Sequence, residues 1–382
     1  MEAIRKPPAP NRDELIALGL LDPGAADAAD RELLLQFLLA RGSTLEELRR
    51  SNELGDLVGA SIDQTLRPGP RLTRRELAWR TAIDDDVLVQ LRQAMGLPDP
   101  GVTAAFYTEA DVLAARAFER LSLLFSESVA LQLMRVAGAA LSRIAEASVS
   151  AFAVNVEAPL RAAGTTEVSM GRAFAEVASS LPDLGRLLDV QLRHHVEAAI
   201  HQFMLTSNGA VSETHSLTVG FVDIVGSTAW ARSLSPSTHA ARIQHFAQLA
   251  GDAVSLHGGR LVKLIGDEAM FVVADSAAAC RIALDIINRC AAAGNIPQVR
   301  AGLATGDVIS RDGDYHGEVV NLAARIVKCA EPDCVVAARS SFEATSRVAG
   351  VGWTVLGARY LRGFDEPVEL VQVVRTKLRA AA

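Results

Sequence analysis

The sequence predicts an α+β protein, in which an all-helical half precedes a half that combines a sheet with helices. Two observations carry this prediction. Residues 1–205 show helical apolar spacing and repeated helix-start signals, with prolines and glycines between the helices. From Ser216 onward, short β-branched runs alternate with helical stretches. The chain has 382 residues, enough for about two or three domains with cores of their own.

Composition narrows the class of protein. Hydrophobic residues make 49% and charged residues 22% of the chain, which is typical of a globular protein. A net charge of −7 and an aromatic content of 5% argue against nucleic acid as a partner. The four cysteines lack zinc-type spacing and are expected to be free thiols. With no signal peptide and no apolar run of about 18 residues, we expect a cytoplasmic protein without a transmembrane segment.

Capping boxes mark three helix starts in the first half: Thr44–Glu47, Thr73–Glu76 and Thr108–Asp111. The segment Leu72–Arg92 resembles a helix-turn-helix. Its second helix would begin with Asp84, Asp85 and Asp86, which would repel DNA phosphates. A helical hairpin inside a bundle is therefore the favoured interpretation.

A long apolar segment, from Asp111 to Val156, covers more than one helical face. It predicts burial within one chain or between two, most simply as a dimer core, with a lipid-binding cavity as the less favoured alternative. A last helix carries His194, His195 and His201, and residues 206–214 follow it as a polar linker. Because an unperturbed histidine titrates near pH 6.5, these three are candidate pH sensors, although solvated or capping histidines are the commoner case.

The second half is expected to run strand, helix, two strands, helix, strand: Leu217–Ile224, Pro236–His257, Gly258–Val273 with a turn at Gly266–Asp267, Ser276–Ala293 and Val299–Ile309. This order predicts a ferredoxin-like βαββαβ sheet with its helices on one face. A helix over Gly317–Cys329 and short strands near Val335, Trp353 and Val368 close the chain.

Two carboxylates end neighbouring strands of this predicted sheet. Asp223 follows the first strand and Asp267 sits in the hairpin turn, so both are expected at one edge. Taken alone, an Asp there is more often a turn or cap residue. Together, two hard oxygen ligands suit two Mg²⁺ ions bridging a triphosphate. Gly226, Ser227 and Thr228 would then offer amide groups to the phosphates.

An amide and a guanidinium occur further on, at Asn321 and Arg325. Their spacing of four places both on one face of the predicted helix. Side chains of these types can hold a ribose and stabilise charge that develops on a phosphoryl group. The bare spacing is a weak signal, and its weight comes from the combination with the two aspartates.

The combination resembles the class III nucleotidyl cyclases, over Ser216 to Val374. The resemblance rests on Phe221–Thr228, Lys263–Asp267, Asp314–Gly317 and Asn321–Arg325. It implies that Asp223 and Asp267 bind two Mg²⁺ or Mn²⁺ ions, that Lys263 and Asp314 read the base, that Asn321 and Arg325 stabilise the transition state, and, more loosely, that Arg362 binds the terminal phosphates.

The implied substrate is ATP, because a lysine donor and an aspartate acceptor complement N1 and N6 of adenine, whereas guanine reverses this pattern. The product would be 3′,5′-cyclic AMP with pyrophosphate. In this family one site draws on two chains, which implies a homodimer. The first half resembles, more weakly, regulatory domains of mycobacterial class III cyclases linked to pH sensing. We therefore expect a regulatory domain (1–205), a linker (206–214) and a catalytic domain (215–382), with a small-molecule or lipid effector as a further candidate partner.

Three alternatives stay open at this point. A guanylyl cyclase would share the fold. A diguanylate cyclase is suggested by Leu264–Met270, but Ile265 stands where close backbone approach requires glycine. A nucleotide-sensing regulator with an inactive cyclase domain is the non-enzymatic alternative, and the presence of both Asp223 and Asp267 argues against it.

Overall fold

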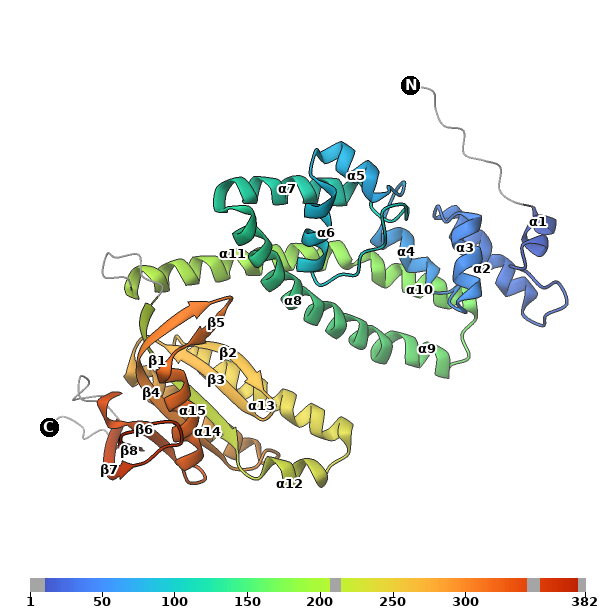
Figure 1. The fold of residues 1–382 in the computed structure, drawn as a ribbon. Coiled ribbons are helices and arrows are strands. Elements are labelled where there is room, and N and C mark those ends of the chain that lie inside the picture. The colour runs from blue at the N-terminus through green and yellow to red at the C-terminus, as the bar shows by residue number, and fades with distance from the viewer. Residues whose placement is uncertain (1–10, 207–213, 342–350, 377–382) are drawn as a thin grey trace. The chain divides into compact units, whose positions relative to one another are not determined.

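The computed structural model describes residues 11–206, 214–341 and 351–376, and the predicted linker lies largely outside them. The chain divides into two compact units, Met1–His195 and Val196–Ala382 (Figure 1). Each unit is described by itself. In the described part of the chain, no helix has the length and apolar character needed to cross a membrane.

The first unit is all-helical, as predicted. Its helices are α1 (Arg12–Ala17), α2 (Ala28–Ala40), α3 (Leu45–Glu53), α4 (Ala60–Leu66), α5 (Arg74–Thr81), α6 (Asp85–Ala94), α7 (Glu109–Phe125), α8 (Glu127–Phe152), α9 (Ala158–Ala162) and α10 (Glu167–Ser179), followed by α11 (Leu181–Thr206), which crosses the division between the units. A short π-helical stretch, Ala153–Glu157, joins α8 to α9. All three predicted capping boxes form, at the starts of α3, α5 and α7.

The segment that resembles a helix-turn-helix forms the pair α5 and α6. Arg74, which is 7% exposed, binds Asp85 at the start of α6 through Nε and Nη2, at 2.8 and 2.9 Å. Its Nη1 donates to both oxygens of Asp99 at 2.6 Å. Asp85, one of the acidic residues that argued against DNA binding, is thus paired with a buried arginine of the preceding helix. This contact supports the interpretation as a helical hairpin.

The long apolar segment is less buried than predicted. Ser126, at φ +79°, separates α7 from α8. Leu124 and Phe125 before this break are 75% and 53% exposed, and Val129 and Leu133 after it are 46% and 44% exposed. Burial within one chain is therefore not observed for these residues, and burial between two chains stays a prediction. The core packed around Phe118 and Leu131 takes only one face of each helix.

The second unit contains one sheet of eight strands: β1 (Thr214–Ile224), β2 (Arg260–Ile265), β3 (Glu268–Val273), β4 (Val299–Arg311), β5 (Asp314–His316), β6 (Val335–Ala338), β7 (Val351–Arg359) and β8 (Val368–Arg375). The strand order is β2-β3-β1-β4-β6-β8-β7, with β5 paired to β4. Each neighbouring pair among the first four strands is antiparallel, and these strands form the predicted ferredoxin-like core. Strand β6 extends this core by a parallel pairing with β4.

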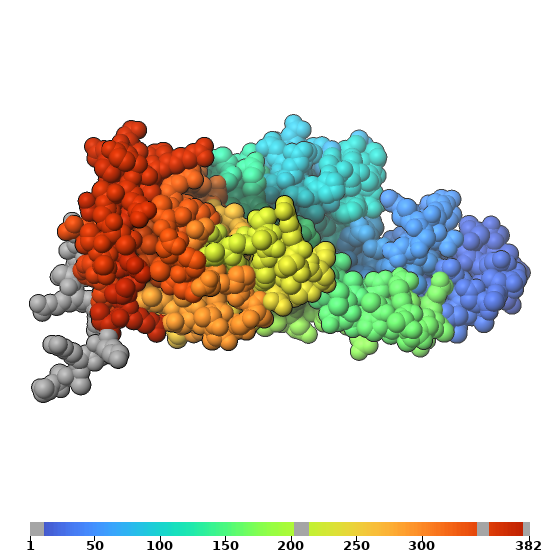
Figure 2. Space-filling view, turned by 90° about the horizontal axis from the view of Figure 1, so that it is seen from below, coloured from blue at the N-terminus to red at the C-terminus, as the bar shows by residue number. Residues whose placement is uncertain are grey.

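Helices cover both faces of this sheet. The two helices of the βαββαβ unit lie on one face, as predicted, and a helix beyond that unit covers the other. Helices α13 (Pro236–Leu256) and α14 (Ser276–Ala293) pack on the face of Phe271, while α15 (Glu318–Cys329) packs on the face of Phe221. Gly302 allows this second layer, since a Cβ there would lie 2.2 Å from the Val327 amide nitrogen. In the space-filling view, atoms coloured yellow to light orange, as for α12 to α14, form part of the visible surface of this unit (Figure 2).

Candidate active site

The end of strand β1 gathers charged side chains from three strands. In the antiparallel register, Asp223 lies opposite Glu268 on β3 and opposite Arg300 on β4. Directly paired residues point to the same face of a sheet, so the three side chains share the face that α15 covers. The Ile224 amide donates to the carbonyl oxygen of Asp267 at 3.3 Å. The β2–β3 turn that carries Asp267 therefore lies beside the end of β1.

Asp223 is buried and held between two cations. Asp223 is 5% exposed. Arg300 donates to Oδ2 through Nε and Nη2 at 2.9 and 2.8 Å, and Lys328 of α15 donates to Oδ1 at 2.9 Å. Sequence reasoning missed both cations. The signal for Arg300 was its place in a predicted strand, but only the register shows that it faces Asp223.

Glu268 is a third carboxylate at this place, also missed by sequence reasoning. Its Oε1 lies 3.4 Å from the Lys328 ammonium, as an ion pair without hydrogen-bond geometry. That oxygen is buried and has no hydrogen-bond partner among the described residues. Burial raises the pKa of Glu268, Lys328 opposes this shift, and the charge of Asp223 adds to it. The site thus places two carboxylates, Asp223 and Glu268, around one lysine ammonium in a poorly solvated place.

The donor set fits a hard divalent cation. Within the described residues, no three His, Cys, Asp or Glu side chains are grouped as a ready-made metal site. Asp223 and Asp267 offer carboxylate oxygens only, the ligands that Mg²⁺ and Mn²⁺ prefer, and remaining positions on such ions are commonly filled by water or substrate phosphates. Asp223 Oδ1 already faces a cation, the Lys328 ammonium. The local chemistry therefore suits a positive ion.

The structure brings Lys263 and Asp314 together as a hydrogen-bonded ion pair. Lys263 lies on β2, and Asp314 opens β5, a short strand that sequence reasoning did not predict. Asp314 also accepts a hydrogen bond from the Tyr315 amide at 2.8 Å. Burial by itself raises the pKa of Asp314, but the hydrogen bonds from Lys263 and Tyr315 outweigh it and leave that pKa below its usual value.

Asn321 and Arg325 lie on α15, and Lys328 follows one turn later on the same stripe. Both Asn321 and Arg325 are exposed. Within the described part of the chain, their side chains take part in no hydrogen bond or ion pair. The structure of one chain thus leaves the side chains of the predicted transition-state pair without polar contacts among the described residues.

The remaining predicted phosphate ligands lie at the start of a helix and in a turn. Gly226, at φ +67°, caps α12 (Ser227–Arg232), and a helix start leaves its first amides without partners inside the helix. These are the amides of Ser227 and Thr228. Arg362 is exposed in the turn between β7 and β8. No contact of the described residues ties Arg362 to Asp223.

The three histidines proposed as pH sensors, His194, His195 and His201, are all exposed on α11.

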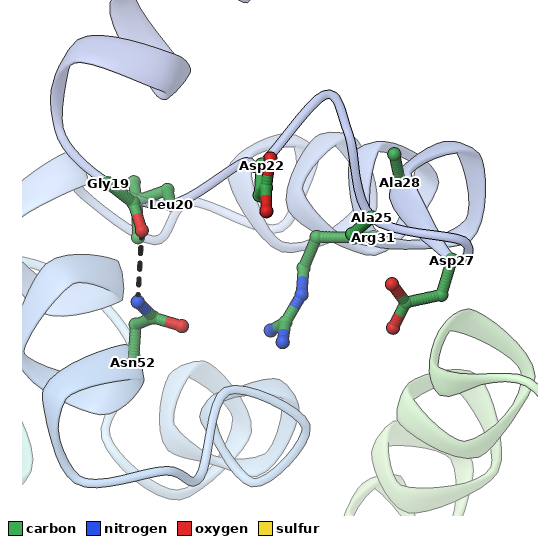
Figure 3. A pocket seen from close by; sticks show the side chains of 8 residues that line it. All are labelled: Gly19, Leu20, Asp22, Ala25, Asp27, Ala28, Arg31 and Asn52. Atoms are coloured by element: carbon green, nitrogen blue, oxygen red, sulfur yellow. Dashed lines mark hydrogen bonds between the residues drawn. The ribbon is translucent and has the colours of Figure 1, made fainter.

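The first unit contains a hollow lined by residues of its N-terminal helices and loops (Figure 3). Its lining includes Asp22, Asp27, Arg31 and Asn52, and Asn52 donates to the carbonyl oxygen of Gly19 at 3.2 Å. Its volume is about 150 Å³, half or less of the roughly 300 to 1,000 Å³ that drug-sized ligands occupy. The hollow is too small and too polar for a lipid chain.

Comparisons with known proteins match both halves of the chain. The model of the adenylate cyclase regulatory domain matches residues 11–197, and that of the adenylate and guanylate cyclase catalytic domain matches residues 210–368. The chain is also similar to the crystal structure of the adenylyl cyclase CyaB from P. aeruginosa, with 22% identity and a TM-score of 0.40 over 44% of this chain and 98% of that one.

Relatives that match over most of their own length support the same family. A protein of Mycobacterium tuberculosis named pH-sensitive adenylate cyclase is 30% identical over 97% of this chain and 94% of its own length. An adenylate cyclase of Streptomyces coelicolor is 32% identical over 70% of this chain and 69% of its own. Identity of this level across both halves extends the family beyond the catalytic motifs. The chain belongs to the class III adenylate cyclases, with a helical regulatory domain ahead of the cyclase catalytic domain.

Proposed function

We propose that this enzyme uses ATP in preference to GTP and forms 3′,5′-cyclic AMP and pyrophosphate at a site shared by two chains. The observation that carries the choice of base is the Lys263–Asp314 ion pair. The ammonium is a donor that suits N1 of adenine, and the carboxylate is an acceptor that suits its 6-amino group. Guanine offers a donor at N1 and an acceptor at O6, so the same pair would meet it with the wrong polarity.

We assign each candidate site residue a separate role in the reaction. Asp223 and Asp267 would hold two Mg²⁺ or Mn²⁺ ions, which when bound acidify the ribose 3′-hydroxyl and neutralise the triphosphate. Asn321 would orient the ribose so that its 3′-oxygen faces the α-phosphorus. Arg325 would donate to the oxygens on which charge develops. The amides of Gly226 to Thr228 and the Arg362 guanidinium would bind the departing pyrophosphate.

A homodimer accounts for two features of the single chain. The Asn321 and Arg325 side chains are exposed and unengaged, as expected if they serve a second chain's aspartates. On α8, Val129, Leu133, Leu141 and Val149 are 44% to 66% exposed. Exposed apolar side chains along one helix are typical of an interaction surface.

The shared site is tested by mixing inactive chains. Asp223→Ala and Arg325→Ala are each expected to abolish activity alone. Random mixing puts half of the dimers in mixed form, each with one intact site of two, so about a quarter of wild-type activity should return. No recovery, with subunit exchange demonstrated by mass spectrometry, would exclude the shared site.

Substrate choice is tested by product chromatography. The purified full chain is incubated with Mg²⁺ or Mn²⁺ and either ATP or GTP, from pH 5.5 to 8. Cyclic AMP should dominate. Formation of cyclic GMP from GTP at equal or higher kcat/KM would overturn the assignment of Lys263 and Asp314. Absence of any cyclic nucleotide would overturn the catalytic proposal.

The helical unit is proposed to regulate turnover in response to pH through His194, His195 and His201. These side chains are exposed on α11, which crosses the division between the units. The test is the pH–rate profile of the full chain beside that of the triple His→Gln variant. Superimposable profiles would reject the three histidines as the sensor.

A further inference from the structure

The two oxygens of Asp223 are held by cations of different kinds. Oδ2 accepts two hydrogen bonds from the Arg300 guanidinium, at 2.9 and 2.8 Å. Oδ1 accepts one from the Lys328 ammonium, at 2.9 Å. Because Asp223 is 5% exposed, each oxygen has little access to water. A divalent ion that binds Asp223 must therefore compete with one of these two partners.

Arg300 is the anchored partner. Its guanidinium makes a forked contact with Oδ2 and also reaches the carbonyl oxygens of Lys328 and Ala330, at 3.4 and 3.5 Å. Its side chain is 25% exposed. It projects from β4, whose backbone is paired with β1 along eleven residue pairs. Displacing Arg300 would break several contacts at once, so Oδ2 stays occupied.

Lys328 is the displaceable partner. Its side chain is 48% exposed and makes a single hydrogen bond to Asp223. A lysine carries its charge on a flexible stem, and an ammonium is a point charge without the fixed geometry of a guanidinium. Glu268 Oε1 lies 3.4 Å from this ammonium and has no hydrogen-bond partner among the described residues. That oxygen is an acceptor toward which the ammonium can turn.

We propose that Lys328 is a built-in counter-cation of the metal site: its ammonium fills the cation position on Asp223 Oδ1 and moves to Glu268 when a divalent metal binds. The inference rests on the proposed assignment of Asp223 as a metal ligand. In the resting chain Lys328 keeps a buried carboxylate neutralised. Lys328 also makes metal binding weaker than the carboxylates alone would give, so that the phosphates of the nucleotide are needed for tight binding.

The first test measures Mn²⁺ binding without nucleotide, by electron paramagnetic resonance on the full chain. Lys328→Met keeps the length of the stem and removes the charge. We expect the Kd for Mn²⁺ to fall about two- to fivefold, the upper part of the range for losing one partly exposed ion-pair partner. Arg281→Met is the matched control, because Arg281 is 44% exposed and pairs with Asp275 on α14, which packs on the opposite face. That variant should leave the Kd unchanged.

Asp223→Asn separates failure of the metal site from failure of the Lys328 proposal. If Asp223→Asn leaves Mn²⁺ binding intact, the assignment of Asp223 as a ligand is wrong and the counter-cation proposal falls with it. If Asp223→Asn removes binding but Lys328→Met binds Mn²⁺ within twofold of wild type, or more weakly, the ligand assignment stands and Lys328 is not a competitor.

A second measurement on the wild-type chain detects the displacement itself and needs no folded variant. The sequence has four lysines, Lys6, Lys263, Lys328 and Lys377, so acylation of each can be followed by peptide mass spectrometry. Saturation with Mn²⁺ should change the acylation rate of Lys328 by at least about threefold, since its amino group leaves a buried carboxylate. Lys263, paired with Asp314, serves as the internal reference. An unchanged Lys328 rate at saturating Mn²⁺ overturns the proposal.

Discussion

Each unit buries one charged side chain between two of opposite sign. In the helical unit, Arg74 lies between Asp85 and Asp99. In the catalytic unit, Asp223 lies between Arg300 and Lys328. The central residues are similarly buried, at 7% and 5% exposure. The two clusters nevertheless suit different purposes, because their partners differ in geometry and surroundings.

The cluster around Arg74 is closed. Its Nε, Nη1 and Nη2 all donate to carboxylate oxygens, so no group of the guanidinium is left for a ligand. The contacts join the start of α5 to the start of α6 and to the loop after α6. This is an arrangement that fixes the positions of helices relative to one another.

The cluster around Asp223 is open. One of its cations is a half-exposed lysine with a single hydrogen bond. A further carboxylate, Glu268, has an oxygen without a hydrogen-bond partner in the described structure, and the turn of Asp267 adjoins the end of β1. Burial of a charge is common to both clusters and does not by itself indicate function. Incompletely satisfied neighbours distinguish the cluster that we propose as the metal site.

The largest expected effect is a loss of catalytic activity when the Asp223 cluster is changed. Asp223→Asn should lower kcat at least about 10³-fold, since metal-ion stabilisation contributes several kcal/mol to the transition state. Hydrogen exchange of β1 and β3 amides should stay close to wild type, because Asn keeps the shape. The control is Asp285→Asn, a carboxylate paired with Arg289 at 3.0 Å on α14. Activity of Asp223→Asn within tenfold of wild type would place Asp223 among the structural clusters.

The next largest expected effect is a loss of stability when the Arg74 cluster is changed. Arg74→Met leaves two carboxylates facing an apolar side chain and should destabilise the α5–α6 region by about 3 kcal/mol. This is the lower end of the range for buried pairs, because Asp85 and Asp99 retain 44% and 32% exposure. Hydrogen exchange on the full chain measures the loss in α5 and α6, with β1 amides as the internal reference.

Arg49→Met provides the matched control for that variant. Arg49 pairs with Glu46 and Glu53 on the surface of α3, and its loss should leave exchange rates in α5 and α6 unchanged. Equal effects of Arg74→Met and Arg49→Met would mean that the Arg74 cluster does not stabilise the fold.

A smaller loss of stability is expected when the charge of Arg74 is kept and only the geometry of the guanidinium is lost. Arg74→Lys keeps the charge but cannot serve two carboxylates with a planar fork, so we expect a loss of about 1 to 2 kcal/mol in the same exchange measurement. Wild-type protection in Arg74→Lys would show that charge alone holds α5 to α6. In that case the contrast with Lys328 would lose its physical basis.

The smallest expected effect is on the pH dependence of the stability of the helical unit. The hydrogen bond from Arg74 and that from the Gly101 amide hold the pKa of Asp99 below its ordinary value. A carboxyl with a depressed folded-state pKa stabilises the fold above its unfolded pKa, about 4, and this contribution is lost as the pH falls through the folded value. Asp99→Asn should therefore lower the urea midpoint of the helical unit at pH 7. The difference from wild type should shrink toward pH 2.5, and a difference independent of pH would contradict the assignment.

Features carried by neighbouring residues in the chain were predictable. The three capping boxes need only residues three apart, and all three form. The βαββαβ order follows from local periodicity, and its strand order follows from the known ways of packing that unit. The same pattern placed the Asp267 turn beside the end of β1.

The sequence by itself determined the two-part organisation, the sheet core and the identity of the candidate site residues, because these depend on local spacing. Only the tertiary structure decided what surrounds Asp223. Arg300 and Lys328 lie 77 and 105 residues away along the chain. Their contacts require the β1–β4 register and the packing of α15 on the face that the sequence left uncovered. Strand register and layer packing are set by the summed burial of many side chains, and no local pattern encodes that sum.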